Sequence, residues 1–111
     1  MSKCRLALLT LLLSTTTSLA FANEPPEIRL VIRGHRFVPA QLVVPANTKV
    51  KLIVVNEDAT PEEFESHELN REKVVVGGGT IPVYVGPLKA GRYPFFGDFH
   101  PDLAQGSLLV E

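Results

Sequence analysis

The amino-acid sequence predicts an all-β protein, an antiparallel β-sandwich of seven or eight strands. From residue 23 onward, short apolar stretches alternate with polar residues, and glycine or proline separates one stretch from the next. This period-two pattern is typical of half-buried strands. In addition, no segment of this region is long and periodic enough for a core helix, so the strands are expected to pack on one another in two layers.

Residues 1–22 are predicted to form a signal peptide. Lys3 and Arg5 give a basic start, residues 6–13 are an apolar run, and residues 20–22 have the small-x-small pattern that signal peptidase recognises. The apolar run is shorter than the roughly 20 residues that a membrane-spanning helix requires. We therefore expect export to the periplasm and one domain over residues 23–111, with no membrane span after cleavage.

Cleavage would remove both sulfur-containing residues, Met1 and Cys4. The domain that remains could form no disulfide, and it could offer a metal neither a thiolate nor a thioether. Loss of Lys3 and Arg5 would also change the formal net charge from −1 to −3. An acidic domain of this kind is a poor candidate for binding nucleic acid.

The elements are expected in the following order. Residues 28–33 alternate apolar and polar side chains up to Gly34, residues 37–40 form a bend, and residues 41–44 form a short strand that ends at Pro45. Residues 48–56 are rich in β-branched side chains and predict a longer strand. Further strands are expected around residues 62–66, 73–76, 80–85, 93–96 and 106–110.

The segment from residue 57 to residue 72 is the least regular part, with six acidic residues before Arg71. A solvated acidic face is the ordinary interpretation of such a segment. Repulsion among these carboxylates would also be relieved by a bound cation.

The carboxy-terminal stretch GRYPFFGDFHPDLAQGSLLV, with Asn56-Glu57-Asp58 and Glu62-Glu63-Phe64 before it, resembles the cupredoxins. It is particularly similar to the cupredoxin-like domains of bacterial periplasmic iron uptake, which occur in EfeO-type proteins and beside high-affinity iron permeases. The resemblance implies a Greek-key sandwich and a metal-binding accessory protein that supports iron uptake. The implied partner is an inner-membrane iron permease or another periplasmic iron-uptake component.

The chain departs from the blue-copper pattern of that family. The pattern would place a thiolate at Gly97, imidazoles at Glu62 and His100, and a thioether near Leu103, and only His100 is present. A trigonal blue-copper centre needs two imidazoles and a thiolate. The sequence therefore excludes a blue-copper centre of this pattern.

The candidate metal ligands that remain are carboxylates and imidazoles. Oxygen-rich sets of this kind favour Fe(II), Fe(III), Mn(II), Cu(II) or Zn(II) over Cu(I), so we expect an iron or copper ion. If Phe64 points into the core, strand alternation sends Glu62 to the same side and the glutamates beside Phe64 to the other, and spacing leaves open which of the three binds. The candidates are Glu62, Glu63, Glu65, Asp98 and His100, with His67 as a secondary ligand and His35 as the weakest candidate.

Two other functions are weighed against metal binding for iron uptake. One is a metal-free cupredoxin-like module for protein interaction, and the other is electron transfer through an unusual copper centre. Ser66 and Ser107 lie in no nucleophile motif, and the glycines at residues 77–79 lack the lysine and helix of a phosphate-binding loop. The sequence thus indicates no conventional enzyme, and ferroxidase-like chemistry would need a second metal or an electron acceptor.

Overall fold

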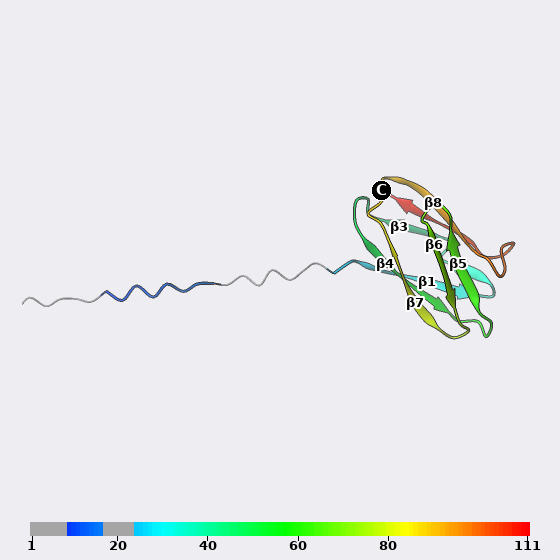
Figure 1. Cartoon of the computed structure of the whole chain (residues 1–111), viewed down its shortest axis with the longest axis horizontal. Helices are drawn as coiled ribbons and strands as arrows, with labels where there is room; N and C mark the ends of the chain where they lie inside the picture. The colour runs from blue at the N-terminus through cyan, green and yellow to red at the C-terminus, as the bar shows by residue number, and fades with distance from the viewer. Residues whose placement is uncertain (1–8, 17–23) are drawn as a thin grey trace, which may run out of the picture.

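Nine strands form two packed sheets, and the loops that join them gather at the two ends of the sandwich (Figure 1). The computed structural model describes residues 9–16 and 24–111. A four-stranded sheet has the order β2-β1-β4-β7, and a five-stranded sheet has the order β3-β9-β8-β5-β6. The strands are β1 (Glu27–Arg33), β2 (Arg36–Val38), β3 (Gln41–Val44), β4 (Val50–Asn56), β5 (Glu62–Ser66), β6 (Arg71–Val75), β7 (Thr80–Val85), β8 (Gly91–Gly97) and β9 (Gln105–Val110).

The predicted all-β sandwich is confirmed, but two of its details were wrong. There are nine strands rather than seven or eight, because residues 36–38 pair with β1 as a short strand where a bend was expected. The sheets are mixed rather than antiparallel. β1 runs parallel to β4, and β3 runs parallel to β9, because chain crossovers between the layers bring these strands side by side.

The core lies between the sheets and is built by alternate residues of each strand. Ile32 and Val54 fill the four-stranded side, and both are fully buried. Phe64 and Phe95 fill the five-stranded side, and their ring centroids are 5.1 Å apart. Each such buried side chain contributes about 1.5–3 kcal/mol relative to an exposed one. Every buried hydrophobic residue of the described chain falls between Leu30 and Val110, so the core of the described chain lies within residues 24–111.

The acidic segment forms a β-hairpin, although it was expected to be the least regular part of the chain. β5 and β6 pair in register, with Glu62 opposite Val75 and Ser66 opposite Arg71. The turn between them is held by the Ser66 hydroxyl, which donates to the Pro94 carbonyl at 2.7 Å and accepts from the Leu69 amide at 3.1 Å. The hairpin thus presents alternate residues of β5 to the core and to solvent.

One end of the sandwich brings together two turns that are far apart in sequence. The β1–β2 turn and the β8–β9 loop both lie at the end away from the C terminus (Figure 1). Gly34 and His35 form the two-residue turn, and both have positive φ, at 58° and 60°. Such two-residue hairpins require positive φ at both central positions, which glycine adopts freely and histidine tolerates.

The predicted signal-peptide cleavage site lies outside the described residues, as do residues 1–8 of the leader. Over residues 9–16 and 24–111, the structure contains no helix of the length and apolar character needed to cross a membrane.

Candidate metal centre

The β8–β9 loop carries His100 and is closed by its own backbone hydrogen bonds. The Gly97 amide donates to the Ala104 carbonyl at 2.9 Å, and the Ala104 amide donates to the His100 carbonyl at 2.8 Å. These bonds turn the chain tightly at the end of the aromatic strand β8. The His100 side chain remains 30% exposed, so one edge of the imidazole is accessible to solvent.

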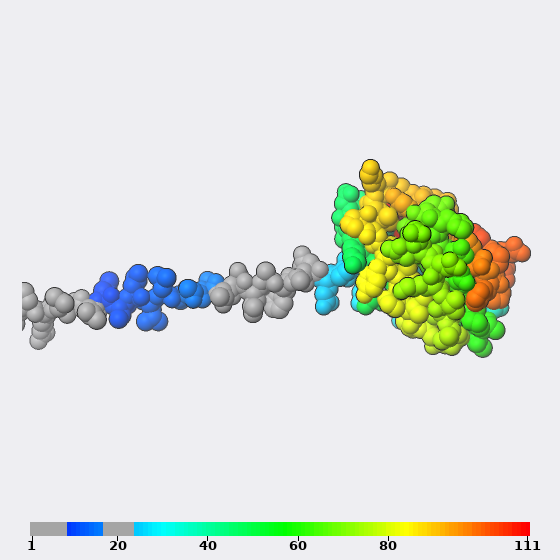
Figure 2. Space-filling model, viewed as in Figure 1, coloured from blue at the N-terminus to red at the C-terminus, as the bar shows by residue number. Residues whose placement is uncertain are grey.

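Glu62, at the start of β5, is buried directly beneath this loop. One carboxylate oxygen, Oε2, lies 2.7 Å from Nδ1 of His100. The other, Oε1, accepts hydrogen bonds from the amides of Phe99 at 2.9 Å and Glu63 at 3.0 Å. A buried carboxylate is costly unless it is paired and hydrogen-bonded, and here both oxygens have partners. Glu62 therefore clamps the loop to β5, where the two segments meet in Figure 2.

Gly97 leaves the space that the Glu62 carboxylate fills. A Cβ atom at position 97 would lie 2.6 Å from Cδ of Glu62 and 2.6 Å from Cβ of Ala104. Both distances are shorter than real contacts allow. The blue-copper pattern predicts a thiolate at position 97. Because residue 97 is glycine in this chain, the Glu62 carboxylate can occupy the space that a side chain there would need.

His35 reaches the same end of the sandwich from the β1–β2 turn. Its ring stacks on that of His100, with centroids 3.6 Å apart and planes inclined by 16°. Asp58 fixes the turn, because its carboxylate accepts from the amides of Gly34 at 2.8 Å and His35 at 2.9 Å. The hydrogen bond from the His35 amide is the main reason that the pKa of Asp58 is lowered from its ordinary value. The Asp58 carboxylate also lies 3.6 Å from Nδ1 of His35.

The candidate metal centre consists of His35, Glu62 and His100. One ligand atom from each lies within 4.8 Å of the others. Two imidazoles and one carboxylate form a set that suits Fe(II), Cu(II) and Zn(II), and the absence of sulfur in the described residues disfavours Cu(I). Because the rings are stacked face to face, they do not point their nitrogens at one point, so binding of an ion would require one ring to turn out of the stack.

The structure divides the predicted ligands between two faces of β5. Of the three glutamates that spacing left open, Glu62 lies against His100, and it shares the core side with Phe64. Glu63 and Glu65 project to the opposite face, where they lie with Glu72 rather than with His100. Strand alternation is the reason, since neighbouring residues of a strand point to opposite faces.

Two further predicted ligands lie outside both groups. Asp98 is exposed in the loop, and its amide donates to the Glu63 carbonyl at 2.9 Å. His67 is exposed in the β5–β6 turn, where its ring packs 5.5 Å from the centroid of Phe96. Neither side chain comes within ligand distance of His100 and Glu62.

The contribution of His35 was underestimated from the sequence. It stands 65 positions before His100 among arginines, and no local pattern links the two residues. Their contact depends on the β1–β2 turn and on Asp58, which follows β4. The Gly-His pair before a second short strand was the available signal for a tight hairpin turn, but it does not indicate what the turn faces.

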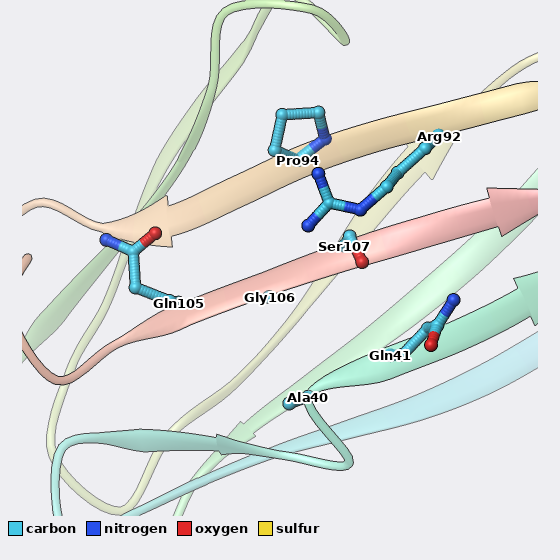
Figure 3. Close-up of a pocket in the computed structure, with 7 residues that line it drawn as sticks. All are labelled: Ala40, Gln41, Arg92, Pro94, Gln105, Gly106 and Ser107. Carbon is cyan, nitrogen blue, oxygen red and sulfur yellow. The ribbon is translucent and has the colours of Figure 1, made fainter.

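A pocket of about 410 Å³ lies elsewhere, on the β3-β9-β8 part of the larger sheet. Arg92 of β8 and Gln41 of β3 lie on either side of Ser107 of β9 (Figure 3). No acidic residue and no histidine lines this pocket. It therefore offers a metal neither a carboxylate nor an imidazole.

The fold is a β-sandwich with a cluster of potential metal ligands at one end. Comparison with known families agrees, because the model of the cupredoxin-like domain family matches residues 4–110. The chain belongs to this family. An uncharacterized protein of Rickettsia prowazekii (strain Madrid E) is 50% identical over 84 residues, which cover 76% of this chain and 67% of that protein.

Solved structures share the fold at low sequence identity. Auracyanin A, a "blue" copper protein from Chloroflexus aurantiacus, is 18% identical with a TM-score of 0.67, over 79% of this chain and all of that one. The metal-binding domain of the Cu(I)-exporting P-type ATPase CopA of Streptococcus pneumoniae D39, solved with Cu(I), is 15% identical with a TM-score of 0.68, over 83% of this chain and 91% of that one. A purple cupredoxin from Nitrosopumilus maritimus is 20% identical with a TM-score of 0.59, over 75% of this chain and 98% of that one.

Proposed function

We propose that this protein is a periplasmic metal-binding accessory protein that holds an iron or copper ion and supports iron uptake. One observation carries the proposal: His35, Glu62 and His100 converge at the end of the sandwich where the β8–β9 loop delivers its histidine. Copper proteins among the structural neighbours support a bound metal ion. The two-histidine, one-carboxylate set favours Fe(II) or Cu(II) over Cu(I).

The test is titration of residues 23–111 with Fe(II) under anaerobic conditions and, separately, with Cu(II). We expect one ion per chain and a rise in melting temperature, because a ligand that binds only the folded state stabilises it. His35→Ala and His100→Ala should each weaken binding by roughly tenfold or more, which corresponds to about 1.4 kcal/mol. His67→Ala is the matched control and should bind as the parent does. Equal affinity in all three variants would contradict the site.

A second candidate function is a metal-free module for protein interaction. The observation in its favour is that Glu62 is already fully satisfied by protein donors, so this end of the fold is closed without an ion. Under this alternative, neither Fe(II) nor Cu(II) would bind at micromolar concentration, and neither would change the melting temperature. The same titration therefore separates the two functions.

The role in iron uptake and the permease partner need a cellular test. We expect a strain that lacks the gene to grow more slowly under iron limitation, and a plasmid copy with His100→Ala to fail to restore growth. Fractionation should place the mature protein in the periplasm. Restoration by the His100→Ala copy would separate the cellular role from the metal centre.

A further inference from the structure

The outer face of the β5–β6 hairpin carries three carboxylates that the proposed centre does not use. Glu63 and Glu65 point outward from β5, and Glu72 lies on the neighbouring strand, directly opposite Glu65 in the register. One oxygen from each lies within 4.8 Å of the others. Like charges directly opposite one another destabilise a sheet, so this arrangement is unfavourable for the protein alone.

The basic residues of the hairpin do not neutralise this group. Arg71 Nε donates to the Tyr84 carbonyl at 2.8 Å, and Lys73 Nζ donates to the Pro82 carbonyl at 3.2 Å. Both acceptors are carbonyl oxygens of β7. None of the ion pairs among residues 24–111 includes a carboxylate of this cluster.

One oxygen of the cluster points to a missing ligand. Oε1 of Glu63 is buried and has no hydrogen-bond partner, and no other buried side-chain polar atom of the described chain is in this condition. Folded proteins pair nearly all such atoms, because an unsatisfied buried acceptor costs about 1–3 kcal/mol. A bound cation would supply the partner that Oε1 lacks and would also offset the repulsion between Glu65 and Glu72.

We propose that Glu63, Glu65 and Glu72 form a second metal site, for a divalent cation that prefers oxygen ligands. Carboxylates without nitrogen or sulfur suit Ca²⁺ and Mn²⁺, whose remaining positions are filled by water. A depression of about 190 Å³ that Glu65 and Glu72 help to line leaves room for that water. This site is on the opposite face of β5 from Glu62, and it does not depend on the function proposed for the histidine centre.

The test is calorimetric titration of residues 23–111 with Mn²⁺ and with Ca²⁺. We expect one ion per chain, and a loss of affinity of roughly tenfold or more in Glu65→Gln and in Glu72→Gln, since affinity depends on the number of charged ligands. Glu68→Gln is the matched control, because Glu68 is an exposed glutamate of the same hairpin outside the cluster. It should bind as the parent does.

Melting temperature gives a second readout, and it distinguishes loss of the site from a general loss of negative charge. Without metal, Glu72→Gln should melt at a higher temperature than the parent, because the repulsion with Glu65 is removed. With Mn²⁺, only the parent and Glu68→Gln should gain stability.

The site would be overturned if no Mn²⁺ or Ca²⁺ bound at millimolar concentration, or if all three variants bound equally. Binding that disappeared only in His100→Ala would assign the ion to the histidine centre instead. Conversely, Fe(II) or Cu(II) binding that survives Glu72→Gln but not His100→Ala supports the histidine centre by itself. The two proposals can therefore fail separately.

Discussion

The glutamate side chains on the two faces of β5 have different hydrogen-bonding surroundings. On the inner face, the Glu62 carboxylate is buried, and both oxygens are hydrogen-bonded to the β8–β9 loop and to the backbone of β5. On the outer face, Glu63 has a buried oxygen without a partner, and it lies beside the carboxylates of Glu65 and Glu72. Adjacent glutamates thus differ in what surrounds them rather than in their own chemistry.

This difference shows that an acidic run does not define one site. The inner carboxylate joins two imidazoles and resembles a transition-metal ligand set, whereas the outer carboxylates form a hard, all-oxygen set. Because successive residues of a strand point to opposite faces, these two kinds of carboxylate stand at adjacent positions of β5. The four predictions below test how far the two faces differ, from the largest expected effect to the smallest.

Removal of the inner carboxylate should have the largest effect. Glu62→Ala leaves the Phe99 amide and Nδ1 of His100 without their acceptor, and it opens a cavity under the loop. We expect a loss of roughly 3 kcal/mol in the free energy of unfolding, measured in urea. Glu65→Ala, on the outer face, should change that free energy little. An equal loss of unfolding free energy in the two variants would show that the inner and outer carboxylates do not differ in their contribution to stability.

The space beside Glu62 is tested by Gly97→Ala. The new Cβ would collide with both Glu62 and Ala104, so we expect a loss of roughly 1–3 kcal/mol in the free energy of unfolding. Ala104→Gly in the same chain should recover part of this loss, because it removes one of the three colliding atoms. If the double variant is as unstable as the sum of the single ones, the collision with Ala104 is not the cause.

The outer face should make stability depend on pH near neutrality. The adjacent Glu72 carboxyl group, then burial and the charges of Glu72, Asp98 and Glu65, raise the pKa of Glu63 from 4.5 to about 7. The folded protein therefore holds this proton more tightly than the unfolded chain does. The resulting stabilisation is complete below pH 4.5 and is lost as the pH rises through about 7.

The measurement is melting temperature against pH in the presence of a chelator, for the parent and for Glu63→Gln. The decline between about pH 5 and about pH 8 should be smaller in the variant. Asp58 has the opposite sign, because its pKa is lowered from 3.8 and its contribution is lost only as the pH falls below that value. A decline of the same size in parent and variant would show that Glu63 is not responsible.

The smallest effect is expected at the cross-strand pair of the outer face. Glu72→Lys replaces a repulsive neighbour of Glu65 by an attractive one and should raise the free energy of unfolding by roughly 0.2–1 kcal/mol without metal. Urea unfolding at low ionic strength measures the change, and added salt should reduce it. Glu68→Lys, away from the pair, serves as the control and should have a smaller effect.

Much of this protein could be predicted from local sequence patterns. The alternation of apolar and polar residues predicted most of the strands. With Phe64 pointing into the core, the same alternation predicted that Glu62 would lie on the core side of its strand and that Glu63 and Glu65 would lie on the other side. His100 was expected to lie near one or more of Glu62, Glu63 and Glu65, and the structure pairs it with Glu62. Strand direction was not predictable, since parallel pairing of β1 with β4 depends on how the chain crosses between layers.

Sequence alone determined the all-β class, the absence of sulfur ligands after residue 22 and the pairing of an acidic segment with a histidine loop. Only the tertiary structure decided that His35 stacks on His100 and that Glu72 completes the outer cluster. The physical reason is that period-two alternation is a local property of one strand, whereas these contacts join turns and strands that hydrogen bonds and core packing bring together from distant parts of the chain.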